Sequence, residues 1–485
     1  MIVTRLRPMN GGQRPSARVV GAPVLAPARP WAAALVALSI AVLAGLVGPF
    51  ANSEAAAAAR WVRPLGSCAT LGAPWVCGQV QVPLDHTSGA GSVVLSLAYR
   101  HPAGPPRNTV VGLAGGPGEP ALAAASFFAG LAAPALGTRD MLVFDPRGVG
   151  QSSPIDCPRI EGERSYSSRD VAHCARQLGP IRGHYASRDT AADLEDIRAL
   201  LGIPQVLPFG ISYGTKDATD YALLYPSRVE AMVLDSVIAP DTDPFYRLAA
   251  GSTVRVLRAE CQAQRCGFDP ATDLTGVVRQ QRSGYVRIAG ASFSEAQLLD
   301  SFIGDKAGLS HLPFWLHAAH HGDPFSLLGD LPTAVADLRS GLPERQSRTV
   351  YLATTCDDSP LPWYQGDPRS VRLAKARAAV RRLGSGFAPF TPDVGLQYGV
   401  AGLCSTWPSA GAEPTLGPLP NVPALVLSGA DDVLTPLEGA LQVTHGLPQA
   451  QLVVVPGATH AVLEQAPCAR AVVARFFAGQ SAGPC

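Results

Sequence analysis

The sequence predicts an α/β protein with a mostly parallel central sheet and a helical insertion late in the chain. Short apolar runs such as 109–113 and 206–209 have the length and composition of buried strands, and each leads into a glycine-rich turn. Between 235 and 423 the alternation of strands and helices gives way to helical segments interrupted by prolines. Two further strand-like runs, 424–429 and 452–455, follow this insertion. We therefore expect one sheet that is completed after the insertion.

The run at 206–209 leads into Gly-Ile-Ser-Tyr-Gly at 210–214, a Gly-x-Ser-x-Gly pattern. The spacing predicts a helix over 216–225, ended by Pro226. A serine at the tip of such a strand-to-helix turn sits in strained backbone, and the glycines let the strand and the helix approach each other. The pattern predicts Ser212 as a nucleophile. Glycine-rich turns with a serine are common, however, so the prediction depends on finding a candidate histidine and a candidate acid elsewhere in the chain.

Candidate partners follow two later strands. Asp431 and Asp432 come directly after the run at 424–429, and His460 comes shortly after the run at 452–455. All three groups lie just beyond strand ends, where open α/β sheets bind ligands, and their order is that of enzymes with this type of turn. We expect Ser212 as nucleophile, Asp432 as acid and His460 as base, with Asp431 as the competitor for the acid role.

The run at 109–113 leads into Gly115-Gly116-Pro117, whose main chain can donate hydrogen bonds to developing negative charge. Pro117 has no N–H, so Gly116 is the expected donor, together with the N–H of Tyr213. The next strand, 141–144, is followed by Asp145 and Arg147, which we interpret as groups that hold the cleft wall through internal hydrogen bonds.

Five patterns occur together: Gly-Gly-Pro-Gly at 115–118, Asp-x-Arg-Gly-x-Gly-x-Ser at 145–152, Gly-x-Ser-Tyr-Gly-Thr at 210–215, Gly-x-x-Asp-x-x-Thr-Pro at 429–436 and a late Gly-x-x-His. As a set they resemble the secreted tripeptidyl aminopeptidases of actinobacteria, relatives of prolyl iminopeptidases in the α/β-hydrolase superfamily. The resemblance runs from about Trp61 to the end of the chain and aligns Asp432, rather than Asp431, with the catalytic acid. The chain departs from the family at Glu119, at Lys216-Asp217 and at Thr459.

The resemblance implies the α/β-hydrolase fold, with a helical cap inserted between the sixth and seventh strands of the sheet. It also implies a serine peptidase that releases tripeptides from free N-termini and requires no cofactor. We expect four segments along the chain: an export signal or anchor over 1–60, the first part of the hydrolase core over 61–238, the cap over 239–420 and the second part of the core over 421–485.

The N-terminal segment has the pattern of an export signal. Several arginines precede an apolar run at 31–47, and small residues suited to cleavage follow at 55–59. The alternative is an uncleaved anchor, because the apolar run approaches the length that spans a bilayer. We expect a secreted or extracellular protein, in contact with a membrane only if this segment is not cleaved.

Ten cysteines in an exported chain predict disulfides, and the even number leaves none over. The family resemblance implies the pairs Cys68–Cys77, Cys157–Cys174, Cys261–Cys266, Cys356–Cys404 and Cys468–Cys485. No metal site is expected, since the cysteines are scattered rather than set at zinc-ligand spacing. His317, His320 and His321 lack the glutamate of a His-Glu-x-x-His site, so we interpret them as surface or cap-packing residues.

The charge balance and the cap bear on the substrate. The formal net charge is +1 and no long block of like charge is present, which argues against a nucleic-acid partner and leaves a peptide as the expected substrate. Binding a free α-ammonium requires a carboxylate at a closed end of the cleft. Asp357 and Asp358 are candidates because a disulfide at Cys356 would fix them, although a solvated acidic turn explains them equally well. Two functional alternatives are a secreted carboxylesterase with the same triad and a catalytically silent binding protein.

Overall fold

The computed structural model describes residues 59–101, 104–161, 167–239, 243–282, 287–288, 291–292, 294–303, 306–323, 346–407 and 417–485. These residues belong to one compact unit. The expected export signal lies outside them, up to residue 58. Among the helices described, none has both the length and the apolar character needed to cross a membrane.

The described strands form a sheet of nine in the order β1-β2-β3-β5-β4-β6-β7-β10-β11. Strands β1, β2, β3 and β5 pair antiparallel, and the strands from β5 through β4 to β11 pair parallel. The predicted mostly parallel α/β sheet is therefore confirmed. In chain order the strands are β1 (Arg60–Ser67), β2 (Trp75–Pro83), β3 (Ser92–Arg100), β4 (Thr109–Leu113), β5 (Asp140–Phe144), β6 (Val206–Ile211), β7 (Met232–Asp235), β10 (Ala424–Gly429) and β11 (Ala450–Val455).

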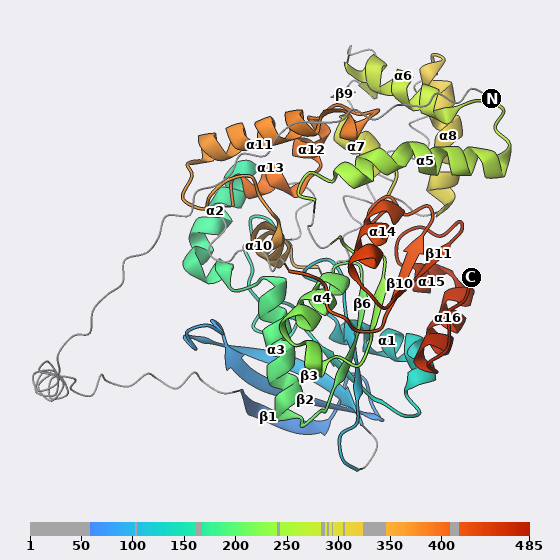
Figure 1. Cartoon of the computed structure of the whole chain (residues 1–485). Helices are drawn as coiled ribbons and strands as arrows, with labels where there is room; N and C mark the ends of the chain where they lie inside the picture. Colours follow the sequence, from blue (N-terminus) through green and yellow to red (C-terminus); the bar gives the residue numbers. More distant parts are fainter. Residues whose placement is uncertain are drawn as a thin grey trace, which may run out of the picture. The chain divides into compact units, whose positions relative to one another are not determined.

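Helices cover both faces of the sheet, which explains why its central strands are apolar runs without alternation. Val110 of β4 lies in one hydrophobic core with α1 (Ala125–Leu131) and α16 (Pro467–Phe477). Its neighbour Val111 lies in the other core with α3 (Ser187–Leu200) and α4 (Gly214–Leu224). Figure 1 shows these two pairs of helices on opposite sides of the strands.

The segment between β7 and β10 forms a cap with a hydrophobic core of its own, built mainly from α5, α6, α8 and α11. The insertion follows the seventh strand in chain order rather than the sixth. The reason is β1, a largely exposed edge strand whose polar, proline-containing sequence has no apolar run to predict it. The cap contains α5 (Arg247–Gln264), α6 (Pro270–Arg282), α7 (Glu295–Asp300), α8 (Lys306–His320), α10 (Arg348–Asp358), α11 (Arg369–Leu383), α12 (Val394–Gln397), α13 (Val400–Cys404) and the short pair β8 (Arg287–Ile288) and β9 (Ala291–Ser292).

Five disulfides tie local elements together, and their pairs are those implied by the family resemblance. Cys157–Cys174 holds the start of the segment after β5 against α2 (Ser168–Leu178), and Cys356–Cys404 joins α10 to α13. All four of these cysteines lie in one further buried cluster, together with Trp407. Figure 1 shows α10 between the cap helices and the sheet.

Candidate active site

The turn between β6 and α4 has the geometry of a nucleophile elbow. Ser212 has a φ of +54°, a left-handed conformation that a residue with a side chain adopts only under constraint. A Cβ at Gly210 would clash with the carbonyl of Gly214, and a Cβ at Gly214 would clash with the carbonyl of Leu113. Both glycines are therefore required by close packing of the strand, the helix and β4, as expected from the sequence.

Asp432 and His460 meet beyond the ends of β10 and β11. The Nδ1 of His460 lies 3.0 Å from Oδ2 of Asp432. Asp432 is only 1% exposed, and it also accepts hydrogen bonds from the N–H and the hydroxyl of Thr435, at 2.9 and 2.7 Å. These contacts fix the carboxylate and orient the imidazole.

The charges of this pair support each other. Burial by itself would raise the pKa of Asp432, but the charge of His460 and the hydrogen bonds from His460 and Thr435 hold that pKa below its ordinary value. Burial would likewise lower the pKa of His460, yet Asp432, assisted by Asp235 and Glu119, raises it above its ordinary value. The site therefore stabilises an imidazolium next to an ionised carboxylate.

Asp431, the competitor for the acid role, faces another way. Its Oδ2 lies 2.7 Å from Nζ of Lys306, at the start of α8, and Lys306 also pairs with Glu260 of α5. Asp431 thus belongs to an ion-pair group between the cap and the core. The structure places Asp432, not Asp431, against the imidazole.

Asp235, at the end of β7, holds the loop that carries His460. Its two carboxylate oxygens accept the N–H groups of Val462 and Leu463, at 3.1 and 3.0 Å, and the adjacent Ser236 hydroxyl accepts the N–H of Ala461 at 2.9 Å. Burial raises the pKa of Asp235 to about 6, against the effect of these hydrogen bonds. The sequence showed a carboxylate after an apolar run here, but its contact with the histidine loop arises only in the fold.

The expected oxyanion donors lie beside the nucleophile. Gly116 has a φ of +106°, and an ideal Cβ on the preceding Gly115 would lie 3.1 Å from the Cβ of Ser212. Gly116, Ser212 and Tyr213 all line one cavity. Asp145 makes the expected internal hydrogen bonds near this turn: its carboxylate accepts the N–H groups of Leu122 and Gln151 at 2.8 and 2.9 Å.

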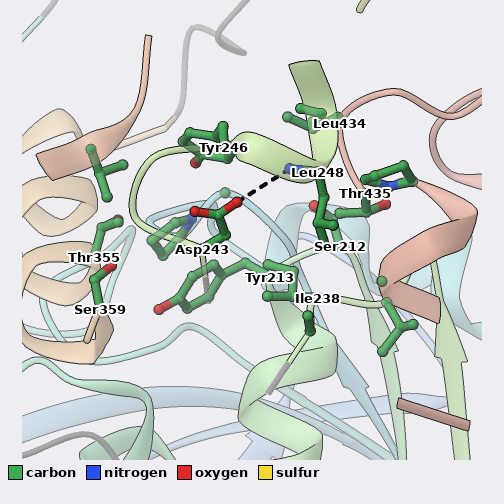
Figure 2. A pocket seen from close by; sticks show the side chains of 18 of the residues that line it. Ser212, Tyr213, Ile238, Asp243, Tyr246, Leu248, Thr355, Ser359, Leu434 and Thr435 are labelled. Atoms are coloured by element: carbon green, nitrogen blue, oxygen red, sulfur yellow. Dashed lines mark hydrogen bonds between the residues drawn. The ribbon is translucent and has the colours of Figure 1, made fainter. Parts of the chain in front are cut away.

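Ser212 lies between two cavities. The smaller, of about 110 Å³, extends under the cap and is lined mainly by apolar side chains; Figure 2 shows it from close by. The larger, of about 710 Å³, contains His460 and two carboxylates, Glu119 and Glu464, in its wall. The nucleophile can therefore reach a bound carbonyl whose two substituents point into different spaces.

Comparison with known proteins agrees with this geometry. A family model described as alpha/beta hydrolase fold matches residues 108–467. The chain belongs to this family. The protein is a serine hydrolase.

Three curated relatives cover most of this hydrolase. Serine protease Hip1 of Mycobacterium tuberculosis is 29% identical over 469 residues, 84% of this chain and 86% of the relative. Tripeptidyl aminopeptidase of Streptomyces coelicolor is 26% identical over 446 residues, covering 81% and 79%. Carboxylesterase B of M. tuberculosis is 25% identical over 459 residues, covering 83% and 84%. The resemblance to tripeptidyl aminopeptidases is thus confirmed, and the interpretation as a silent binding protein gains no support.

The two carboxylates expected to bind a substrate ammonium do not lie where that role requires. Asp357 and Asp358, at the end of α10, are 3% and 4% exposed, and neither is among the described residues that line the two cavities at Ser212. Asp358 instead accepts hydrogen bonds from the Tyr213 hydroxyl and the Ser187 N–H, at 2.5 and 3.0 Å. Tyr351 and Thr355, one helical turn apart on α10, line the small cavity in their place.

The histidines of α8 gather around Asp273 of α6. His317 and His320 place Nδ1 atoms 2.9 and 2.8 Å from its two carboxylate oxygens. Asp273, His320 and His321 have ligand atoms within 4.8 Å of one another, close enough to hold a metal ion. The ring of His320 is also packed directly against Gly276 of α6, however, and this contact fits the expected cap-packing role.

Proposed function

We propose that this hydrolase is a secreted exopeptidase that releases short peptides, namely tripeptides, from free N-termini through an acyl-enzyme. The observation that supports the proposal most directly is the position of Ser212 between a small covered cavity and a larger one that contains His460. The relatives named as a serine protease and a tripeptidyl aminopeptidase support the peptidase reaction.

In this mechanism Ser212 Oγ attacks the scissile carbonyl and gives its proton to Nε2 of His460. Asp432 holds the imidazole and stabilises its charge, while the N–H groups of Gly116 and Tyr213 bind the oxyanion. His460 then protonates the leaving amine. Because the proton donor must lie on the leaving-group side, the larger cavity takes the leaving peptide, and the smaller takes the acyl half that ends in the free N-terminus. Water, activated by His460, releases the acyl group.

Export is supported by the five disulfides, which persist in oxidising compartments. The exported protein, denatured without reductant, is expected to react with no thiol reagent, and its Edman sequence is expected to begin after the apolar segment 31–47. A free thiol in stoichiometric amount, or an intact N-terminus in the culture medium, would contradict secretion in this form.

A panel of chromogenic substrates tests the activity. It compares free-amine tripeptides, N-acetylated tripeptides and short acyl esters, with Ser212→Ala as the variant that separates catalysis at this site from contamination. The proposal requires free-amine tripeptides to be hydrolysed fastest and all activity to disappear in Ser212→Ala. The second candidate, a secreted carboxylesterase with the same triad, is favoured by the carboxylesterase relative. It requires esters to be hydrolysed at least as fast as free-amine peptides.

A further inference from the structure

The small cavity contains one carboxylate, that of Asp243, in a wall otherwise made largely of apolar residues. Asp243 lies eight residues beyond β7, where the chain enters the cap. Its two oxygens accept the N–H groups of Phe245 and Leu248, at 3.1 and 3.2 Å, at the beginning of α5. Figure 2 shows the carboxylate between Ser212 and the helix that carries Thr355 and Ser359.

The charge of Arg247, at the start of α5, favours the ionised form of this carboxylate, but Arg247 forms no ion pair with it. Among the ion pairs of the described residues none includes Asp243, whereas Asp431 and Glu438 pair with Lys306 and Arg255. Burial raises the pKa of Asp243, against the hydrogen bonds from Phe245 and Leu248. A half-buried carboxylate that faces a cavity and forms no ion pair with a described residue favours a cationic ligand there.

The hydroxyl of Thr355 is a second polar group in the same wall. Thr355 of α10 is 7% exposed and lines the cavity, and its hydroxyl has no hydrogen-bond partner among the described residues. The neighbouring Thr354 differs, since its hydroxyl donates to the carbonyl of Tyr185 at 2.6 Å. Buried hydroxyls are normally hydrogen-bonded, so Thr355 indicates a ligand with a donor at this place.

We infer that Asp243 and Thr355 form a binding site for a primary ammonium group in the acyl half of the substrate. The inference rests on the proposed function for the reaction, and adds the residues that recognise the substrate. An ammonium offers three N–H donors, enough for a carboxylate oxygen of Asp243 and the hydroxyl of Thr355 together. The ammonium can come from two sources: the N-terminal residue with its α-ammonium, or a lysine side chain next to the scissile bond.

The test measures kcat/KM of the full chain on matched pairs of p-nitroanilides. Alanyl and trialanyl substrates are used with a free and with an acetylated amine, and N-acetyl-lysyl substrate is compared with N-acetyl-alanyl substrate. The variants are Asp243→Asn and Thr355→Val. The matched controls are Asp269→Asn and Thr354→Val. Asp269 is an exposed carboxylate that accepts a backbone N–H in the first turn of α6, as Asp243 does at α5. Titration with a fluorophosphonate gives the fraction of active Ser212 in each preparation.

If the site binds an ammonium group, Asp243→Asn lowers the ratio of kcat/KM between the charged and the uncharged member of a pair about tenfold or more, mainly through KM. Thr355→Val lowers this ratio less. Loss confined to free-amine substrates assigns the α-ammonium, and loss confined to the lysyl pair assigns the side chain. An unchanged preference in Asp243→Asn overturns the inference. If the wild type hydrolyses esters but no anilide, the proposed function fails; the same comparison with alanine and N-acetyl-alanine esters then decides the ammonium site separately.

Discussion

The hydroxyl of Tyr213, the residue after the nucleophile, donates a 2.5 Å hydrogen bond to the carboxylate of Asp358 in the cap. Asp358 also accepts a hydrogen bond from the N–H of Ser187. The hydroxyl of Ser187 donates to Asp220, and Asp220 forms a 2.9 Å ion pair with Lys216 of α4. Lys216, one of the two charged residues behind the nucleophile that depart from the family pattern, thus belongs to a buried network. This network connects α10 of the cap to the helix that begins at the elbow.

The link between Tyr213 and Asp358 is expected to stabilise the fold and to position the oxyanion donor. Tyr213→Phe and Asp358→Asn should each lower the free energy of unfolding by about 1–3 kcal/mol, because a hydrogen bond to a buried carboxylate is lost. Their effects should be less than additive in the double variant, by about 1 kcal/mol or more. Urea unfolding and kcat of the four proteins check this. Additive effects on both quantities would show that the two side chains act independently.

Asp432→Asn is expected to lower kcat by about 10⁴-fold, because the amide favours the wrong tautomer of His460. Asp431→Asn is the matched control on the neighbouring residue. It removes the ion pair with Lys306 and should mainly reduce stability, with a change in kcat of less than about tenfold. Steady-state kinetics with the best anilide substrate compare the two, and the opposite ranking would move the acid role to Asp431.

The pH dependence of kcat/KM is expected to reflect His460. The neutral imidazole accepts the serine proton, so activity rises with pH through the pKa of this group in the free enzyme. Since that pKa is raised, the midpoint of the acid limb should lie above the ordinary value of 6.5. Glu119→Gln removes one of the negative charges that raise it and should shift the midpoint lower. A wild-type midpoint below 6.5, or a shift upward in Glu119→Gln, would contradict this electrostatic arrangement.

Asp235→Asn is expected to loosen the loop that carries His460. An asparagine keeps one acceptor but points an NH₂ group at the N–H of Val462 or Leu463, which leaves a buried donor unpaired. We expect a loss of about 1–3 kcal/mol in unfolding free energy and slower labelling of Ser212 by a fluorophosphonate. Ser236→Ala, which removes only the acceptor for Ala461, should have a smaller effect of the same kind. A normal labelling rate in a destabilised Asp235→Asn protein would limit Asp235 to a structural role.

Local sequence was sufficient for the elements whose chemistry is local. The apolar runs at β4, β6 and β10 predict buried strands because both faces of such strands must be covered. Gly210 and Gly214 predict the elbow because a Cβ at either place would collide with the backbone. The chain order of Ser212, Asp432 and His460 identified residues that lie beyond the carboxyl ends of the parallel strands β6, β10 and β11.

The tertiary structure decided the direction in which side chains of similar chemistry face. Asp431 and Asp432 are adjacent in sequence, yet one meets Lys306 and the other His460. The sequence suggested Asp358 as an ammonium-binding residue, but its carboxylate accepts a hydrogen bond from Tyr213. Asp243, which no local pattern distinguishes, lines the small cavity instead. The physical reason is that the partners of these carboxylates come from elements far apart in the chain. Burial and pairing, which determine what a carboxylate does, exist only once those elements have packed together.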